Sequence, residues 1–151
     1  MENGQGTLED NEIFDGVLYG IIMSGSNPTL RRNRIFMNGR FGFLSSIYSG
    51  GGIYMRNSQA TLEDNEIFAN EGPGVEIMPG VITTGGNLII RTDSNPILRR
   101  NRITQNSSVG IAVILDGGGI FEDNDLRGNT GGAWYIAPES TARVQRSGNI
   151  E

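Results

Sequence analysis

Thr7–Ile13 has the sequence Thr-Leu-Glu-Asp-Asn-Glu-Ile, and the same motif returns four more times along the chain. The copies are Thr29–Ile35 (Thr-Leu-Arg-Arg-Asn-Arg-Ile), Thr61–Ile67 (Thr-Leu-Glu-Asp-Asn-Glu-Ile), Ile97–Ile103 (Ile-Leu-Arg-Arg-Asn-Arg-Ile) and Ile120–Leu126 (Ile-Phe-Glu-Asp-Asn-Asp-Leu). A short repeat with strand-like content predicts a solenoid, because each coil can bury its apolar face only against its neighbours. The repeat therefore decides the fold.

The charges of this motif change sign from each copy to the next. Parallel strands of neighbouring coils lie about 4.8 Å apart, so equivalent side chains touch. Stacking alternates acid and base along one row: Glu9, Arg31, Glu63, Arg99 and Glu122. The rows that begin at Asp10 and Glu12 alternate in the same way. Exposed ion pairs contribute only about 0 to 1 kcal/mol each, but a slip by one coil would place acids on acids, so we interpret the rows as register control.

The spacing of the motif gives the length of a coil. Its asparagines are separated by 22, 32, 36 and 23 residues (Asn11, Asn33, Asn65, Asn101 and Asn124). The basic coil is therefore 22 or 23 residues, and two coils carry loop insertions near 37–51 and 78–88. A degraded sixth copy ends the chain at 142–150. We predict an all-β fold, a right-handed parallel β-helix of about six coils that forms a single domain over 1–151.

Alternation within the motif predicts the core. We expect two inward rows, Leu8, Leu30, Leu62, Leu98, Phe121 and Val144, and Ile13, Ile35, Ile67, Ile103 and Leu126. A second strand in each coil begins at Gly20–Met23, which we align with Gly132–Tyr135 at the far end. The asparagines of the motif, and a later row of Asn38, Asn70, Asn106 and Asn129, are predicted to form hydrogen-bonded ladders at turns, with Asn itself in the left-handed backbone conformation.

The composition excludes most catalytic chemistry. The chain has no cysteine, histidine or lysine, and all twelve positive charges are arginines. Disulfides, thiolate or imidazole metal ligands, Ser-His-Asp and Cys-His catalytic sets and lysine mechanisms are therefore excluded. The Gly-Gly-x-Gly-x-Asp repeat of calcium-binding β-rolls is also missing, so we expect no metal and no cofactor.

Net charge and hydropathy limit the classes of partner that we expect the chain to bind. The formal charge is -5 and the arginines lie between acidic rows, so we expect no nucleic acid. The longest apolar runs, such as 20–23 and 88–90, are too short for a membrane span, and 1–4 lacks the features of a signal peptide. We therefore expect no membrane partner, and an intracellular protein, cytoplasmic or nuclear.

Inserted loops on a rigid solenoid are where new contacts arise most readily. Aromatic side chains there would anchor a protein partner, and the first insertion carries Phe41, Phe43 and Tyr48. Trp134 and Tyr135 are further candidates, while the alternative for all five is that they cover the core. We predict protein binding at these residues.

Carbohydrate chemistry is the alternative function. Parallel β-helices host sugar lyases and glycosidases that act through carboxylates. Asp93 and Asp116 lie outside the alternating rows, and with Arg91 and Tyr54 they form the alternative carbohydrate site. The Asn-Thr-Asp, Gly-His-Gly and Arg-Ile-Lys signatures of polygalacturonases are absent, so we predict no enzyme activity and keep a sugar lyase or hydrolase as the minor alternative.

The motifs at Gly6–Asp15, Ser26–Ile35 and Thr92–Asn101 are similar to the repeats of the F-box only protein eleven family, and the similarity covers nearly the whole chain. This resemblance implies a right-handed parallel β-helix that serves as the substrate-recognition platform of a cullin-RING ubiquitin ligase. The sequence shows neither an F-box helical segment nor the zinc-finger residues that accompany that family. Protein binding through a repeat surface is therefore what the resemblance implies here.

The two ends of the predicted solenoid differ in charge. The first coil carries the acids Glu9, Asp10 and Glu12, and the last coil carries Arg143 and Arg146. We see no capping helix in the sequence at either end, and uncapped solenoid ends tend to associate. Head-to-tail stacking of copies is therefore a further prediction.

Overall fold

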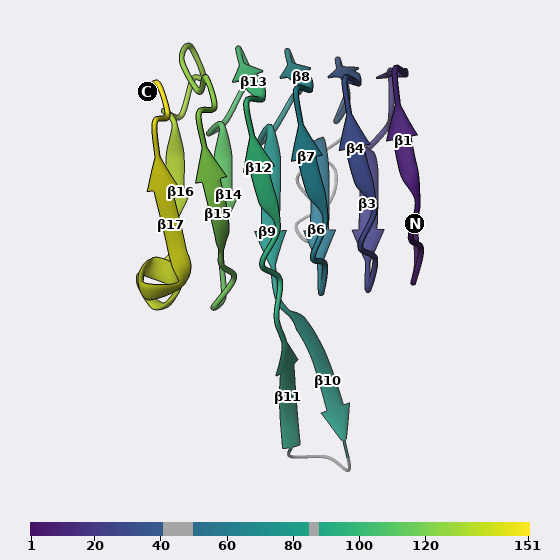
Figure 1. Ribbon diagram of the computed structural model, residues 1–151, viewed down its shortest axis with the longest axis vertical. Coiled ribbons are helices and arrows are strands. Elements are labelled where there is room, and N and C mark those ends of the chain that lie inside the picture. Colours follow the sequence, from purple (N-terminus) through teal and green to yellow (C-terminus); the bar gives the residue numbers. More distant parts are fainter. Residues whose placement is uncertain (41–49, 85–87) are drawn as a thin grey trace.

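The chain winds into a row of stacked coils, which lie side by side in Figure 1. This computed structural model describes residues 1–40, 50–84 and 88–151, and for 81–84 and 88–91 it describes the backbone only. Strands of successive coils pair in parallel and form three sheets within the described part of the chain. These sheets are the sides of the stack.

Each half of the repeat motif belongs to a different sheet. The first sheet runs in the order β1 (Thr7–Glu9), β4 (Thr29–Arg31), β7 (Thr61–Glu63), β12 (Ile97–Arg99), β15 (Gly119–Glu122) and β17 (Val144–Ser147). The second sheet contains β2 (Glu12–Phe14), β5 (Arg34–Phe36), β8 (Glu66–Phe68) and β13 (Arg102–Thr104). The third contains β3 (Tyr19–Ser24), β6 (Gly51–Arg56), β9 (Val75–Met78), β14 (Ile111–Val113) and β16 (Trp134–Ile136).

The inward rows of the three sheets meet in one apolar core. The rows predicted from the motif are buried in the inner coils: Leu30, Leu62, Leu98 and Phe121 on the first sheet, and Ile35, Ile67 and Ile103 on the second. Leu8 and Ile13 are only partly buried, because β1 and β2 are edge strands. Burial contributes about 25 cal/mol for each Å² of apolar surface, so these rows hold the coils together.

The register confirms the alternation of charge. Glu9 pairs with Arg31, Arg31 with Glu63, and so on through Arg99 and Glu122. The Arg31 guanidinium lies 3.0 Å from the Glu63 carboxylate, and that of Arg99 lies 2.7 Å from Glu122. A shift by one coil would replace every such pair by a repulsive one.

The predicted asparagine ladders are present, with one correction to their backbone. Along Asn11, Asn33, Asn65, Asn101, Asn124 and Asn149, each Nδ2 donates to the Oδ1 of the next asparagine at 2.9 to 3.0 Å. The left-handed residue is not the asparagine but the one before it, such as Asp10 (φ 57°) or Arg32 (φ 51°). The reason is that the turn points this preceding side chain outward, while the asparagine must face inward to reach the next coil.

The second ladder, Asn38, Asn70, Asn106 and Asn129, has the same geometry. A serine row that the sequence analysis did not identify lies at the third corner, where Ser26, Ser58 and Ser94 are fully buried. The backbone nitrogen of Ser58 donates to Ser94 Oγ at 3.0 Å. Buried polar side chains thus support all three corners of a coil.

The last coil differs from the prediction in two places. Val144 pairs with Gly119, and Arg146 takes the place opposite Phe121 that we assigned to Val144. On the third sheet Trp134 pairs with Ile111, so the equivalent of Gly110 is Ala133 and not Gly132. In both cases the hydrogen bonds between coils set the register, and apolar similarity misplaced it by one or two residues.

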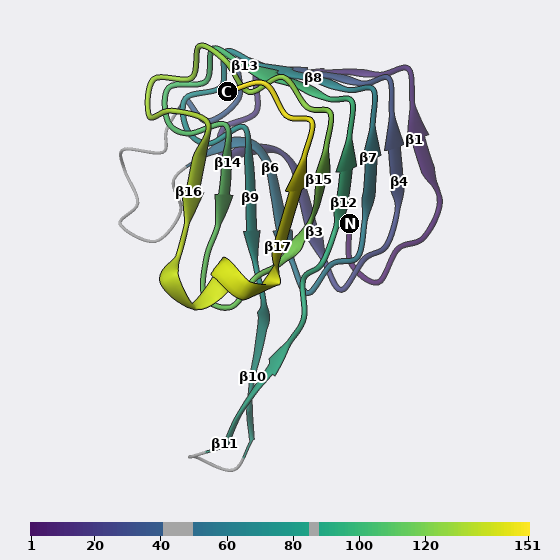
Figure 2. The same cartoon turned by 60° about the vertical axis from the view of Figure 1, so that its left-hand side comes forward.

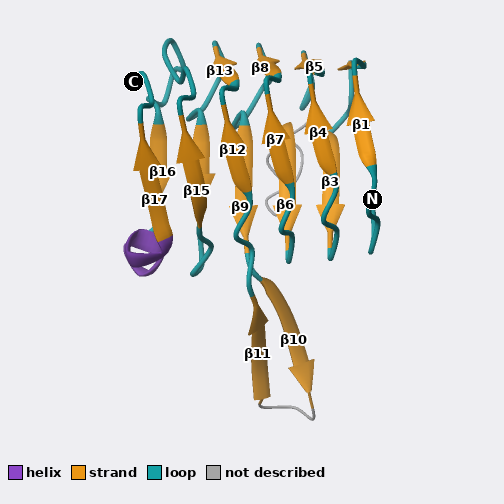
Figure 3. Cartoon of the chain, viewed as in Figure 1, coloured by secondary structure: helices purple, strands orange, loops and turns teal. Residues whose placement is uncertain are grey.

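The second insertion is a hairpin that projects from the stack, as Figure 2 shows. It consists of antiparallel β10 (Gly80–Thr84) and β11 (Leu88–Thr92), so it continues to Thr92 and does not end near residue 88. Most of the first insertion lies outside the described residues. Between β16 and β17 the chain forms the 3₁₀-helix η2 (Pro138–Arg143), coloured purple in Figure 3.

Candidate functional site

The outer face of the second sheet carries two parallel rows of side chains. In each strand the central isoleucine points into the core, so by alternation both of its neighbours point outward. One neighbour gives a charge row, Glu12, Arg34, Glu66 and Arg102, and the other gives an aromatic row, Phe14, Phe36, Phe68 and then Thr104. We call these two rows together the aromatic–arginine face.

The phenylalanine rings of this face form a continuous stack. The centroids of Phe14 and Phe36 are 5.2 Å apart with an interplanar angle of 19°, and those of Phe36 and Phe68 are 5.1 Å apart with an angle of 8°. Phe14, at the edge of the sheet, is 56% exposed. The Arg34 guanidinium lies 5.3 Å from the Phe36 centroid and 5.5 Å from that of Phe68, within the range of cation–π attraction.

The charge row links the strands beside these rings. Arg34 forms ion pairs with Glu12 and, at 3.3 Å, with Glu66, and Arg102 lies 3.5 Å from the other Glu66 oxygen. The hydrogen bond to Glu12 is the main reason that the pKa of Arg34 is raised above its ordinary value. The row presents the arginine guanidinium groups beside an apolar stripe.

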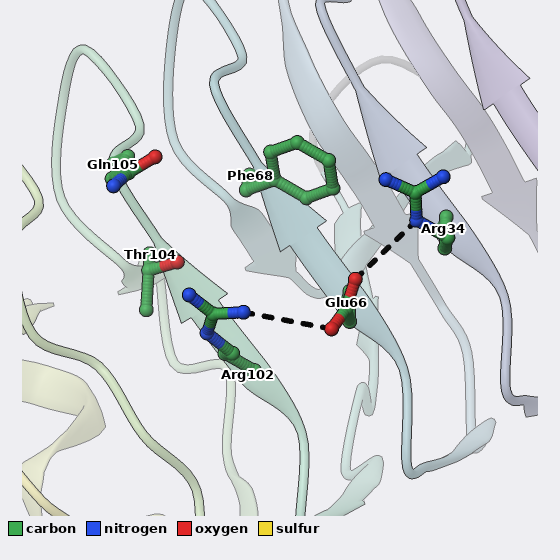
Figure 4. Close-up of a pocket in the computed structure, with 6 residues that line it drawn as sticks. All are labelled: Arg34, Glu66, Phe68, Arg102, Thr104 and Gln105. Carbon is green, nitrogen blue, oxygen red and sulfur yellow. Dashed lines mark hydrogen bonds and ion pairs between the residues drawn. The ribbon is translucent and has the colours of Figure 1, made fainter.

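The aromatic row stops at Thr104, where a small hollow opens. Figure 4 shows this hollow between the Phe68 ring, Thr104 and Gln105 on one side and the Arg34–Glu66–Arg102 chain of ion pairs on the other. Its volume is about 190 Å³. Pockets for drug-sized ligands are larger, about 300 to 1,000 Å³, so this hollow suits a single side chain.

In the other charge rows, the acidic and basic side chains pair with one another. Arg32 donates to both Asp10 oxygens at 2.8 Å, and Arg100 donates to the two Asp64 oxygens at 2.9 and 3.1 Å. These hydrogen bonds hold the pKa of Asp10 and of Asp64 below the ordinary value. Bidentate pairs of this kind leave few donors or acceptors for a ligand, so these rows serve the register of the coils.

A second hollow lies on the outer face of the third sheet. It is lined by Glu2, Leu18, Tyr19, Ile22, Ser24, Tyr54 and Arg56, with a volume of about 290 Å³, and we call it the tyrosine hollow. The Tyr19 and Tyr54 rings lie 5.3 Å apart, and the Tyr19 hydroxyl donates to Glu76 Oε2 at 2.6 Å. Burial raises the pKa of Glu76, and the bond from Tyr19 opposes that shift only in part.

The residues predicted to bind a protein have different surroundings. Phe41, Phe43 and Tyr48 lie outside the described residues. Trp134 packs against the core, with its ring edge-on to Phe121 at 5.4 Å, and its Nε1 donates to Glu151 at 2.6 Å. Tyr135 points outward from the third sheet and is 54% exposed.

The residues of the alternative carbohydrate site come from several elements of the stack. The Asp93 carboxylate forms an ion pair with Arg143 at 2.6 Å. Asp116 lies in the turn after β14, and Tyr54 lies on β6 in the tyrosine hollow. Arg91 lies in β11, opposite Val81, and its side chain is outside the described residues.

The sequence analysis missed the aromatic–arginine face, although a signal was present. We ended the motif at its isoleucine, one residue too early. Continued by one position, it gives Glu-Ile-Phe, Arg-Ile-Phe, Glu-Ile-Phe and Arg-Ile-Thr at residues 12–14, 34–36, 66–68 and 102–104. Apolar side chains that recur at one outward position of neighbouring strands form a contiguous patch, which makes that face a candidate interaction site.

In the ranges 1–40, 50–84 and 88–151, no group of three or more acidic side chains is placed to hold a metal ion. Over the same ranges, no helix has the length and apolar character that crossing a membrane requires.

Three parallel sheets wound from a repeated motif, with a patterned outer face, define this molecule as a solenoid repeat protein. The chain belongs to the family described as the right-handed β-helix region, whose model matches residues 1–81 and 44–150. The predicted right-handed parallel β-helix is therefore confirmed. A search of curated proteins finds no match to the chain.

Proposed function

We propose that this chain is a non-catalytic protein-interaction module whose binding surface is the aromatic–arginine face. The observation that supports the proposal most strongly is the stack of Phe14, Phe36 and Phe68 on an outer surface, with Arg34 beside the rings. Aromatic and arginine side chains supply most of the binding energy in protein interfaces, where an apolar centre is surrounded by polar groups. Here the charge row provides the polar border.

Rigidity of the solenoid also favours this role. The four strands of the second sheet are held in register by backbone pairing, and the isoleucines beneath them are packed in the core. A surface that is already ordered loses little conformational entropy on binding, so more of the contact energy appears as affinity.

The test is a comparison of three versions of the chain in quantitative capture from cell lysate. The double variant Phe14→Ser/Phe36→Ser removes the exposed Phe14 ring and the half-buried Phe36 ring without touching the inward rows, and Tyr135→Ser removes a ring about as exposed as Phe14 from the third sheet. We expect proteins that bind the unaltered chain saturably to be lost by at least about tenfold with the double variant and retained with Tyr135→Ser. Equal capture by all three versions would overturn the proposal.

A finer proposal follows from the resemblance to the F-box only protein eleven family. We propose that the captured proteins are substrates for ubiquitination, presented to a ligase by this β-helix. The resemblance in the repeat motif is its support. Capture of ubiquitin-ligase subunits with the unaltered chain would favour this proposal. Captured partners without any ligase subunit would contradict the ligase role but not the proposed interaction module.

Carbohydrate binding is the second candidate function, and the tyrosine hollow supports it. Sugar rings pack on aromatic side chains, and the half-buried Tyr54 ring lines this hollow beside the buried Tyr19 ring, whose hydroxyl donates to Glu76. A glycan array with the unaltered chain and with Tyr54→Ala tests this candidate, and Asp10→Asn serves as a control at the ion pair with Arg32. Binding that is lost only with Tyr54→Ala would support it, and the absence of any bound glycan would remove it.

A further inference from the structure

The step after Phe68 in the aromatic row is occupied by a side chain without a ring. Thr104 pairs with Phe68 in the register of β13 and β8, one coil beyond the stacked phenylalanines. Rings along this row are 5.1 to 5.2 Å apart, close to the spacing of parallel strands. Thr104 is only 7% exposed and forms the floor of this position, so a ring placed above it would continue the stack on the side of Phe68 that faces Thr104.

An arginine, Arg127, borders the Thr104 position on the side away from Phe68. A backbone bridge joins Arg102 to Asp125, and a further hollow of about 260 Å³, next to that of Figure 4, is lined by Thr104, Gln105 and Arg127 among other residues. Arg127 donates to both Asp125 oxygens at 2.9 Å, which fixes its guanidinium beside the hollow. The space above Thr104 thus lies between Phe68 and Arg127, and we call it the aromatic slot.

Arg102 is the arginine of this face with a donor to spare. Among the described residues its side chain has one ion pair, at 3.5 Å to Glu66, and Glu66 is shared with Arg34. Asp125 is held by Arg127, and the Arg102 side chain is 60% exposed. A carboxylate from outside would therefore find a cation at the border of the slot.

We propose that the aromatic slot receives an aromatic side chain of the protein partner, and that a carboxylate two residues away in the same extended segment binds Arg102. This inference rests on the proposed interaction function and names the chemistry of the partner. The ring stacks on Phe68 and meets the Arg127 guanidinium on its other face, both favourable arrangements for an aromatic group. In an extended segment, side chains two residues apart lie on the same side, so one strand supplies both groups.

The probe for this proposal is the capped tripeptide Phe-Ser-Glu, titrated into the full ¹⁵N-labelled chain by NMR. We expect saturable shifts of the amides of Phe68, Arg102, Thr104 and Gln105, with a midpoint of about 1 mM. Phe-Ser-Gln should bind about threefold more weakly, because it lacks the carboxylate, and Ala-Ser-Glu should not bind. No shifts at about 10 mM peptide, or equal shifts with Ala-Ser-Glu, would overturn the proposal.

The variant Thr104→Phe closes the slot with a ring of its own. We expect it to abolish peptide binding, while Val17→Ser, at an exposed apolar side chain between β2 and β3, keeps it. A folded Thr104→Phe chain that still binds Phe-Ser-Glu would contradict the inference, and if that variant does not fold, the peptides on the unaltered chain decide. Some partners could be lost with Phe14→Ser/Phe36→Ser and still be captured normally by Thr104→Phe. That result would contradict the proposed slot but not the proposed interaction module.

Discussion

At the scale of single residues, the fold depends most on the hydrogen bonds of the buried asparagines. Asn65 is 1% exposed, its Nδ2 donates to Asn101 Oδ1 and to the Leu30 carbonyl at 2.9 Å, and its Oδ1 accepts from Asn33. Each of these partners is itself buried, so removing the side chain leaves several polar groups without a hydrogen bond. An unsatisfied buried group costs more than the bond itself contributes.

We predict that Asn65→Ala lowers the free energy of unfolding by about 3 kcal/mol. The matched control is Asn11→Ala, because Asn11 lies at the exposed end of the same ladder and its loss should cost less than about 1 kcal/mol. Urea denaturation of the two variants measures both values. Similar costs for the two positions would show that burial of the ladder is not what makes it stabilising.

Glu76 is predicted to lower the stability of the folded chain at neutral pH, whereas Asn65 raises it. Burial raises its pKa above the ordinary 4.5, so at neutral pH the folded chain carries a carboxylate that is more stable in the unfolded state. Glu76→Gln should therefore stabilise the fold at pH 7. The gain should shrink as pH falls through the folded-state pKa and should vanish below about 4.5, where the unfolded state is protonated as well. Thermal unfolding from pH 3 to 7 checks this trend, and a gain that is independent of pH would contradict it.

At the scale of elements, the charge rows specify how neighbouring coils pair. Arg34 lies between Glu12 and Glu66, so a change of sign there creates two repulsive contacts. We predict that Arg34→Glu destabilises the fold more than Arg34→Gln, which only removes the two ion pairs. The difference should nearly disappear in 1 M salt, where the screening length is about 3 Å. Equal effects of the two variants at low salt would show that the sign is irrelevant.

The third-sheet strand of the last coil contains a matched pair of aromatic residues. Trp134 covers Phe121, and the Arg146 guanidinium lies 5.2 Å from its ring, whereas neighbouring Tyr135 faces solvent. We predict that Trp134→Ala lowers the free energy of unfolding by about 2 to 3 kcal/mol and that Tyr135→Ala changes it by less than about 0.5 kcal/mol. Chemical denaturation compares them. A small loss for Trp134→Ala would indicate that the ring is kept for binding and not for the core.

The elements show which features a sequence of this kind predicts. The motif predicted the coil length, the inward rows, the ladders and the pairing of Glu9 with Arg31, because stacking repeats the same local choice in every coil. Prediction was wrong where the repeat decays: Val144 was placed opposite Phe121, a position that Arg146 holds. There the hydrogen bond from Asn124 to Asn149 sets the register, and apolar character was a misleading guide.

The surface features were harder to predict, because they arise between coils. Tyr19 bonds to Glu76 across 57 residues of sequence, and the aromatic slot forms only because Thr104 follows Phe68 in the stack. No local pattern encodes either contact. The aromatic row could have been predicted, because its residues recur at a fixed position of the motif. Only the inward residues of the motif were followed from coil to coil, and the outward ones were not.

At the scale of the whole molecule, the solenoid separates stability from recognition. The core and the ladders lie inside, and the outer faces carry what varies from sheet to sheet: ion pairs on the first, phenylalanines on the second and tyrosines on the third. The charges predicted to join copies head to tail include Asp10, which already pairs with Arg32, and Arg143, which already pairs with Asp93. Self-association stays a prediction, and the second sheet is the surface that we propose for binding another protein.

The most direct test of this account places a photo-reactive phenylalanine analogue at position 14, and in a separate chain at position 135. After irradiation in lysate, the account predicts protein adducts at position 14 that an excess of unaltered chain suppresses, and few at position 135, although both side chains are about equally exposed. Suppressible adducts at position 135 with none at position 14 would show that the partner binds the third sheet. That result would contradict the assignment of the aromatic–arginine face.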